Sequence, residues 1–322
     1  MASSRRIFLA LPLVLFVALA NPPALRAVEA QSAPAQPASV LPPLKYAEVS
    51  ASVTMLQNER PYGSNITCIA TKEGLIFVDA SLFTEVAAKF RKDMEAKYQK
   101  KTLALLLSHA HTDHFFGMGA FSDVPVFLAS SGREYFEQQL GVDYASRVAG
   151  YERVFPRFGE ALKTARLFMP GVWFEKEMQF GSGENMLRVH NTGGHSLCSS
   201  YAYLPSQRVL VAGDNVQVDA YPYFGDPTGE MDTWIKTLKG WEAMPIGVVC
   251  PGHGRPVDRA YLTSVRIFFE DLVAAVTKLK GEKVPEEQVV NHPSLPKGYW
   301  GEGLPEPGWY RPTIAGLYRS IP

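Results

Sequence analysis

The sequence predicts a layered domain of the α/β or α+β class, and three observations carry this prediction. Apolar runs bounded by turn residues indicate several early strands that follow one another without helices. Later strands alternate with amphipathic helices, which is typical of such layered domains. The chain has 322 residues, of which 46% are hydrophobic and 20% charged, and this is enough apolar material for a large core. The composition excludes a disordered chain, a collagen-like chain and a small scaffold held by disulfides.

The predicted elements follow from the spacing of apolar side chains. Strands are predicted at 66–70, 75–79, 103–107, 124–129, 186–190, 200–204, 208–212 and 246–250. Helices are predicted at 84–100, within 133–162, at 231–244 and at 259–280. The first helix has the clearest pattern, because apolar side chains recur every four residues from Val86 to Tyr98 and charged residues lie between them. These elements define a domain at 45–280. Residues 281–322 are rich in Pro, Gly and aromatics and predict an extended tail packed on that domain.

Residues 1–30 have the pattern of an export signal. Arg5 and Arg6 precede the apolar run 7–20, which would make a helix of about 21 Å, shorter than a bilayer core of roughly 30 Å. Cleavage is expected after Ala20 or after Ala30, and we favour the second site. Residues 4–9 resemble the bacterial twin-arginine signal, which carries folded proteins, and a general secretory signal is the alternative. We therefore expect a periplasmic or secreted protein without a stable membrane anchor once the signal is removed.

The segment that follows this signal and the overall charge set further limits. Residues 31–44 are rich in Ala, Pro, Ser and Gln and predict a flexible linker. The chain has 32 basic and 32 acidic residues, so it lacks the basic excess that marks a nucleic-acid-binding protein.

The three cysteines are far apart, and Cys68 and Cys250 are expected to be buried in strands. Cys198 is expected to serve packing. The sequence carries no signal for an oligomeric state.

The strongest chemical signal is a run of histidines directly after a predicted buried strand. The segment Ser108-His109-Ala110-His111-Thr112-Asp113-His114 places three histidines and a carboxylate within six residues. Such a group cannot be buried in an apolar core without polar partners. Imidazole nitrogen and carboxylate oxygen are donors that suit Zn²⁺ and similar cations. The segment therefore predicts a metal site at a strand end.

Three later segments offer donors that could reach the same site. His195 lies in Asn191-Thr192-Gly193-Gly194-His195-Ser196, Asp214 follows the run 209–212, and His253 follows the run 248–250. Each signal is weak by itself, since a lone histidine is usually structural. Together with the histidine run they supply seven donors at predicted strand ends, where the active sites of α/β proteins lie.

This pattern resembles the metallo-β-lactamase superfamily. The match consists of the HxHxDH motif at 109–114 followed by His195, Asp214 and His253 in the family's order. The resemblance covers about 46–259 and implies a four-layer αββα sandwich with two metals at one edge. It implies a first metal held by His109, His111 and His195, a second held by Asp113, His114 and His253, and Asp214 as the bridge. It also implies that Asp79 supports the histidine loop from behind.

The resemblance further implies a hydrolase with two Zn²⁺ per chain, although nitrogen and oxygen donors also accept Fe or Mn. Two cations sharing one water lower its pKa, and the resulting hydroxide attacks a carbonyl or phosphoryl centre. Asp113 is the predicted catalytic residue, because it can hold the proton of this nucleophile. No serine or cysteine nucleophile is required.

The family contains many substrates, so three functions stay open. The ligand set favours a hydrolase of a small carbonyl ester, lactone or thioester. A β-lactam hydrolase is the first alternative: export favours it, but three-histidine lactamases generally lack the bridging carboxylate that Asp214 supplies. A periplasmic accessory protein of sulfur or quinoprotein metabolism, which keeps the metals mainly for binding, is the second.

The expected partner is a small molecule, and an aromatic segment after Asp214 offers a pocket for it. Tyr221, Tyr223 and Phe224 could line a pocket for an apolar acyl or ring substrate, or they could pack in the core. A cluster of basic residues that would bind glutathione carboxylates is not identifiable in the sequence. This weakens the hypothesis that the protein is a thioesterase for glutathione esters.

Overall fold

The computed structural model describes residues 41, 43–59, 63–141, 144–154, 156, 159–183, 186–298 and 310–322. The described residues from 41 onward belong to one compact unit. The predicted signal at 1–30 and most of the predicted linker lie outside the described residues. In the part of the chain that is described, no helix is both long and apolar enough to cross a membrane.

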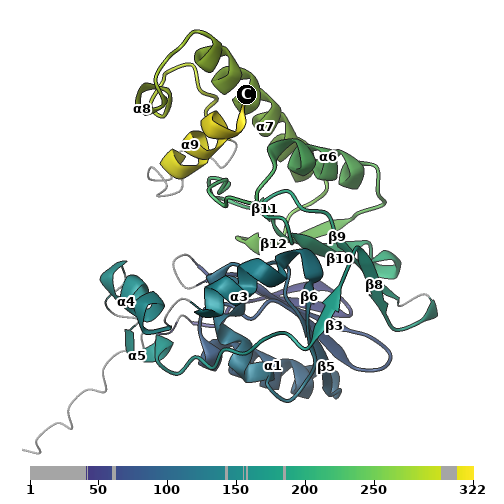
Figure 1. Ribbon diagram of the computed structural model, residues 1–322. Coiled ribbons are helices and arrows are strands. Elements are labelled where there is room, and N and C mark those ends of the chain that lie inside the picture. Colours follow the sequence, from purple (N-terminus) through teal and green to yellow (C-terminus); the bar gives the residue numbers. More distant parts are fainter. Residues whose placement is uncertain are drawn as a thin grey trace, which may run out of the picture. The chain divides into compact units, whose positions relative to one another are not determined.

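Two β-sheets form the centre of the unit (Figure 1). The first sheet contains, in this order, β1 (Tyr46–Ser50), β2 (Val53–Leu56), β3 (Ile66–Ala70), β4 (Leu75–Val78), β5 (Thr102–Leu106), β6 (Val126–Ala129) and β7 (Val172–Phe174). Its strands are antiparallel from β1 to β4 and parallel from β4 to β7. The second sheet has the order β12 (Val248–His253), β11 (Val209–Gln217), β10 (Ser200–Leu204), β9 (Leu187–Asn191) and β8 (Glu177–Phe180). Only the β11–β12 pair is parallel in this sheet.

The helices of the described chain pack against the two sheets or against one another. They are α1 (Thr84–Tyr98), α2 (Thr112–Phe115), α3 (Arg133–Gly141), α4 (Tyr144–Val154), α5 (Gly159–Leu162), α6 (Met231–Glu242), α7 (Ala260–Gly281), α8 (Glu286–Val289) and α9 (Tyr310–Ser320). Helix α1 buries its apolar stripe, which contains Val86, Phe90 and Met94, in the core of the first sheet. Helices α6 and α7 pack together over the second sheet (Figure 1).

Strand β11 contributes side chains to two separate apolar clusters. Val209 and Val211 belong to the apolar cluster between the two sheets, whereas Leu210 and Ala212 belong to the cluster under α6 and α7. Successive side chains of a strand point to opposite faces, so a fully apolar strand must be covered on both sides. The observed layers, helices outside two facing sheets, confirm the predicted αββα arrangement.

The predicted strands and helices are present, with small differences at their ends. Four strands were not predicted: β1, β2, β7 and β8. The side chains of β1 are only half-buried and β7 has three residues, so neither produces a periodic pattern. Cys68, Cys198 and Cys250 are buried free thiols, and Cys68 and Cys250 lie in strands as expected.

The C-terminal segment differs from the expected extended tail, because residues 310–320 form helix α9. Pro312 lies in the first turn of this helix, where the missing N–H of proline removes no helical hydrogen bond. Thr313, Ile314 and Leu317 are buried on one face, and α9 contacts α7 and α8. Helix formation here depends on packing against α7 and α8, which the composition of the segment does not reveal.

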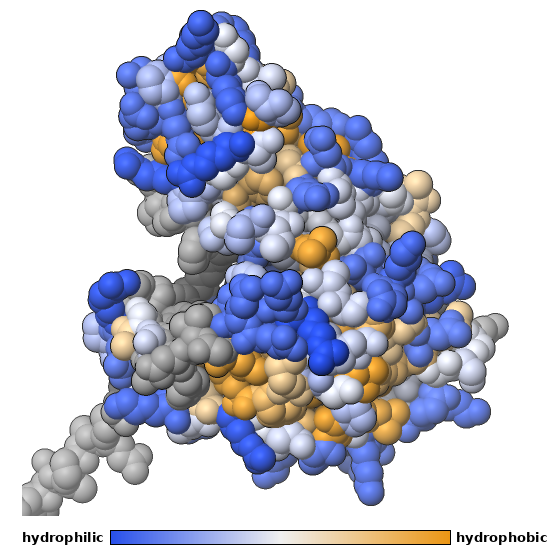
Figure 2. Space-filling model, viewed as in Figure 1, coloured by the Kyte–Doolittle hydropathy of each residue, from blue (hydrophilic) through white to orange (hydrophobic). Residues whose placement is uncertain are grey.

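The surface is mainly polar over the C-terminal helices. Figure 2 shows hydrophilic residues over the visible face of α7–α9, at the top of the view, and apolar residues gathered lower on the molecule. The large apolar side chains that remain exposed come from separate segments: Leu103, Met169, Val172, Leu197 and Ile267. Exposed apolar residues of this kind are common in folded proteins when they occur singly.

Candidate metal centre

The histidine loop follows β5 and is anchored by one buried carboxylate. Asp79 Oδ1 accepts a hydrogen bond from the Ser108 N–H (2.7 Å), and Oδ2 accepts one from the Ser108 hydroxyl (2.8 Å). The same Oδ2 lies 2.8 Å from His114 Nδ1. Asp79 has φ of 64°, an uncommon conformation for a residue other than glycine, and it is 3% exposed. It therefore joins both ends of the histidine loop to the end of β4.

The remaining predicted donors reach the same place from the second sheet. His195 follows β9, Asp214 lies within β11, and His253 is the last residue of β12. Asp214 was expected just beyond a strand, but β11 continues to Gln217 through an irregularity in its pairing with β12. Gly252 makes the close approach possible, because a Cβ at this position would lie 2.0 Å from Asp214 Oδ1.

The structure brings all seven predicted donors together in two adjoining groups. One ligand atom from each member of a group lies within 4.8 Å of the others, and the groups are His109, His111, His195 and Asp214, then Asp113, His114 and His253. The carboxylate of Asp214 faces both groups. Its Oδ2 is 3.7 Å from His195 Nε2, while its Oδ1 is 3.2 Å from His114 Nε2 and 3.5 Å from His253 Nε2.

The electrostatics of the first group suit a bound cation. Burial, together with the neighbouring imidazoles, lowers the pKa of His109 well below its usual value and that of His195 to about 4. Both rings are therefore neutral near pH 7 and offer lone pairs. His109 Nε2 is buried and has no hydrogen-bond partner among the described residues. Leaving such an atom unpaired costs about 1–3 kcal/mol, and coordination of a metal would remove this cost.

The acidic residues supply negative charge at the junction of the two groups. Burial alone would raise the pKa of Asp214, but His253 and His114 outweigh it and hold this pKa well below the usual range. For His114 the balance is reversed: burial lowers the pKa, and Asp214, Asp79 and Asp113 together raise it. The Asp214 and Asp113 carboxylates are thus ionised beside imidazole rings, and carboxylate oxygen with imidazole nitrogen is the donor set that Zn²⁺ accepts. The residues present therefore fit two divalent cations.

Two ring nitrogens that face away from the donor cluster are fixed by the loop 218–230, which connects β11 to α6. His195 Nδ1 donates to the carbonyl oxygen of Tyr223 (2.9 Å), and His111 Nε2 lies 2.5 Å from Asp226 Oδ2. These contacts turn the opposite nitrogens, His195 Nε2 and His111 Nδ1, toward each other at 3.0 Å. Partners of this kind fix the tautomer and orientation of a metal-binding histidine.

Asp226 is a site residue that the sequence analysis missed. Its carboxylate also accepts hydrogen bonds from the N–H and the hydroxyl of Thr228 (2.7 and 2.6 Å). Burial opposes ionisation, but the hydrogen bond with His111 outweighs it, and the pKa of Asp226 falls to about 2. The available signal was a single carboxylate directly after the aromatic run 221–224.

Two of the three predicted pocket residues are in the core instead. Tyr221 is fully buried and packs edge-to-face against Phe268 and Tyr310. Phe224 is 3% exposed and lies beside Trp234. Tyr221 and Phe224 thus follow the second of the two expectations, packing in the core, because the C-terminal helices cover this side of the loop.

Tyr223 is the one member of the aromatic run that lies beside the donors. Its ring is half-buried, with its centroid 6.0 Å from that of His111 and 6.1 Å from that of His195. Tyr135 of α3, which was not predicted, lies 6.3 Å from the His111 ring. Together, the Tyr135 and Tyr223 rings place aromatic surface near the first donor group.

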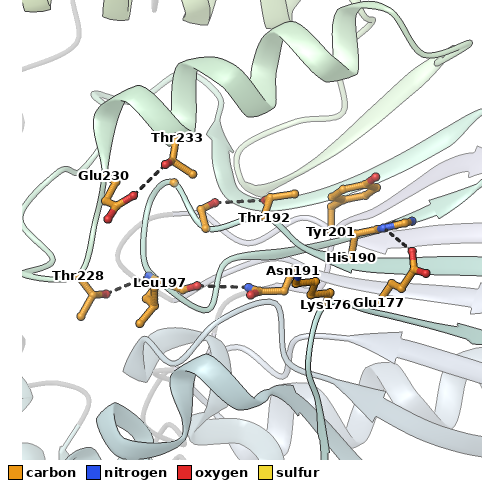
Figure 3. Close-up of a pocket in the computed structure, with 12 residues that line it drawn as sticks. Lys176, Glu177, His190, Asn191, Thr192, Leu197, Tyr201, Thr228, Glu230 and Thr233 are labelled. Atoms are coloured by element: carbon orange, nitrogen blue, oxygen red, sulfur yellow. Dashed lines mark hydrogen bonds and ion pairs between the residues drawn. The ribbon is translucent and has the colours of Figure 1, made fainter.

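A pocket of about 670 Å³ is lined in part by the loop that carries His195, including Gly194 and Leu197 (Figure 3). Its walls come from β8, β9, β10 and the start of α6, with Glu230 and Thr233 above His190 and Tyr201 in the view. None of the seven predicted donors lines this pocket. His190 stacks on Tyr201 with ring centroids 5.1 Å apart and lies 3.4 Å from Glu177. Both partners belong to neighbouring strands of the second sheet, so the role of His190 is structural.

Comparison with known proteins gives one consistent family. The family model of the metallo-β-lactamase superfamily matches residues 60–253, a range that includes all seven donors. A metallo-β-lactamase type 2 from Bacillus sp. (strain 170) is 23% identical over 207 residues, covering 62% of this chain and 70% of that protein.

Solved structures with the same fold include a lactamase and a sulfatase. The metallo-β-lactamase from Pontibacter korlensis superposes with a TM-score of 0.55 and 19% identity, over 71% of this chain and 100% of that one. The inverting sec-alkylsulfatase Pisa1 from Pseudomonas sp. gives a TM-score of 0.65 and 20% identity, over 86% of this chain and 50% of that one.

Proposed function

The chain belongs to the metallo-β-lactamase superfamily, and on this basis we propose that it is a metal-dependent hydrolase with a dinuclear centre. The observation that carries the proposal is the position of Asp214, whose two oxygens face separate groups of buried donors. A carboxylate in this position can bridge two cations. This bridging role distinguishes a dinuclear centre from a site that holds a single ion.

The donor sets assign the ligands of each metal. His109, His111 and His195 would hold the first, and Asp113, His114 and His253 would hold the second, with Asp214 between them. We propose zinc as the resident metal, since neutral imidazoles and carboxylates are its usual nitrogen and oxygen ligands. The same donors accept iron or manganese, so supply in the compartment of folding also contributes to the choice.

Two such cations, when bound, would lower the pKa of a water in the site toward neutrality and polarise the bond under attack. The residues of the chain supply the proton transfer. The Asp113 side chain is 31% exposed, compared with 6% for Asp214, and its Oδ2 lies 3.2 Å from His253 Nε2. The contact with His253 thus holds Asp113 at Oδ2, and the exposed part of the side chain leaves the carboxylate accessible. Such access is required for it to accept the proton of the attacking water.

We propose a small ester, lactone or thioester as the substrate. Tyr135 and Tyr223 provide aromatic surface near the first donor group, which suits an uncharged acyl or ring group. A β-lactam is the second candidate, and the lactamase relative from Bacillus favours it. Ring-opening of a cephalosporin with a rate above that for simple esters would select the second candidate.

A role in metal binding without turnover is the third candidate. The buried donors would serve an accessory protein as well as an enzyme, so geometry alone does not separate these two. A fully loaded protein that hydrolyses no ester, thioester, lactone or β-lactam would select the accessory role.

Export of the chain is also a proposal, and it is supported by the adjacent arginines and short apolar run at the N-terminus. Cell fractionation with N-terminal sequencing of the mature protein tests it. A mature chain that begins near residue 31 outside the cytoplasm supports export, and an intact N-terminus in the cytoplasm contradicts it.

The central experiment compares metal content and hydrolysis in matched variants. The purified protein should contain about two metal equivalents, and His111→Ala should lose metal and reduce turnover by at least 10²-fold, because it removes a ligand. His190→Ala is the control, since His190 lies outside the donor groups, and it should retain both properties. Turnover in His111→Ala equal to that of the control would overturn the proposal.

A further inference from the structure

We propose that the C-terminal helix α9 is part of the metal site, and that Thr313 is a positioning residue for its histidines. This inference rests on the proposed function and adds an element that lies well outside the family-model match at 60–253. Helix α9 contacts the connecting loop 218–230, and this loop in turn contacts two of the metal donors.

The connecting loop holds two histidines of the first donor group at once. The carbonyl oxygen of Tyr223 binds His195 Nδ1, and the carboxylate of Asp226 binds His111 Nε2. The two contacts are only three residues apart. A displacement of this short segment would therefore turn both rings together.

Thr313 fixes the backbone on both sides of Tyr223. Its hydroxyl oxygen accepts a hydrogen bond from the Phe224 N–H (3.0 Å), and the hydroxyl donates to the Pro222 carbonyl oxygen (2.8 Å). Thr313 is 0% exposed, and Phe224 and Pro222 are also buried. Buried backbone groups require such partners, so this one hydroxyl determines where the Tyr223 carbonyl lies.

Gly316 provides a second contact between α9 and the same loop segment. A Cβ at this position would lie 2.3 Å from the Phe224 carbonyl oxygen. Alanine is more favourable than glycine within a helix, so the glycine costs helix stability here and allows the close approach. The helix and the loop thus touch at two points one turn apart.

Helix α9 is also anchored to α7 and α8. The Lys280 ammonium group of α7 donates to the carbonyl oxygen of Tyr318 (2.9 Å), and Arg319 pairs with Glu286 of α8. Ile314 and Leu317 are buried against the same helices. Helix α9 is therefore a fixed support and not a loose terminus, so it can hold the loop in place.

Zinc affinity of the metal-free protein measures this role directly. Partners that orient metal-binding histidines typically contribute 10- to 100-fold in affinity. Thr313 acts through the loop, so we expect Thr313→Val to raise the Zn²⁺ dissociation constant of the first site roughly tenfold, near the lower end of this range. Thr313→Ser keeps the hydroxyl and should stay within about twofold of wild type.

The measurement is a competition for Zn²⁺ between each metal-free variant and a chromophoric chelator at fixed pH. Thr54→Val is the matched control: Thr54 is also 0% exposed and its hydroxyl lies 2.8 Å from Tyr98 Oη, far along the chain from the donors. Both valine variants should unfold at lower urea concentration, and only Thr313→Val should bind zinc more weakly. Co²⁺ absorption spectra of the loaded variants should change only for Thr313→Val.

A second pair of variants keeps the test decisive if Thr313→Val does not fold. Gly316→Ala should weaken zinc binding, whereas Gly240→Ala in α6 should not, because a Cβ at Gly240 meets nothing within 4 Å. Zinc affinities of Thr313→Val and Gly316→Ala within twofold of their controls would overturn the inference while the proposed function stands. A wild-type protein that binds no zinc would contradict the proposed function itself, and the inference would fall with it.

Discussion

The histidine loop at 108–114 and the connecting loop at 218–230 hold the same donor cluster in different ways. The histidine loop is anchored by Asp79 at the end of the neighbouring strand, within the first sheet. The connecting loop is anchored by Thr313, which lies about ninety residues away in the chain. The first support is local to the sheet that presents the ligands, and the second depends on packing of a separate helical layer.

This difference predicts different responses to mutation. Loss of the Asp79 anchor should damage folding and metal binding together, since it leaves buried donors unpaired inside the sheet. Loss of a contact in the connecting loop should affect metal affinity more than stability.

Asp79→Ala should have the largest effect. It leaves His114 Nδ1 and two groups of Ser108 without their buried partner, and breaking a buried ionic pair costs about 3–5 kcal/mol of unfolding free energy. Urea denaturation measures this loss. Glu137→Ala removes an exposed pair with Arg133 and should cost at most about 1 kcal/mol. Equal losses in the two variants would refute the anchoring role of Asp79.

Asp226→Ala should mainly weaken metal binding. The change removes the partner of His111 Nε2, and we expect a roughly 10- to 100-fold rise in the zinc dissociation constant. Asp226→Asn retains an acceptor oxygen and should lie between wild type and Asp226→Ala. Chelator competition provides the measurement, and unchanged affinity in Asp226→Ala would show that the connecting loop does not orient His111.

Tyr135→Leu should have the smallest effect on metal binding. The Tyr135 ring lies beside that of His111, with ring centroids 6.3 Å apart, but Tyr135 is not one of the seven donors. With an ester that has an apolar acyl group, KM should rise several-fold while metal content stays the same. A KM equal to that of wild type would remove Tyr135 from the proposed substrate surface.

The metal donors could be predicted from the sequence because four of them lie close together in the chain and have the side-chain types of metal ligands. His109, His111, Asp113 and His114 form one dense motif after a buried strand, and dense polar clusters have few structural explanations. Asp79 could be placed because it ends a predicted strand at the position where the resembled family carries a supporting carboxylate.

The support from the second sheet could not be predicted in the same way. Asp226 is one carboxylate in an aromatic segment, and its role appears only when His111 is brought beside it. Tyr221 and Phe224 have the composition of a pocket, but α7 and α9 bury them. Helix α9 itself follows a Pro- and Gly-rich segment and is stabilised by tertiary packing, which overrides local propensity.

Anomalous X-ray diffraction at the zinc edge, from crystals of the zinc-loaded protein, tests the central claim most directly. The account predicts two peaks, each about 2.0–2.2 Å from its nitrogen and oxygen ligands. One peak should lie among His109, His111 and His195, and the other among Asp113, His114 and His253. The carboxylate of Asp214 should contact both. A single peak, or two peaks that Asp214 does not join, would contradict the dinuclear centre proposed here.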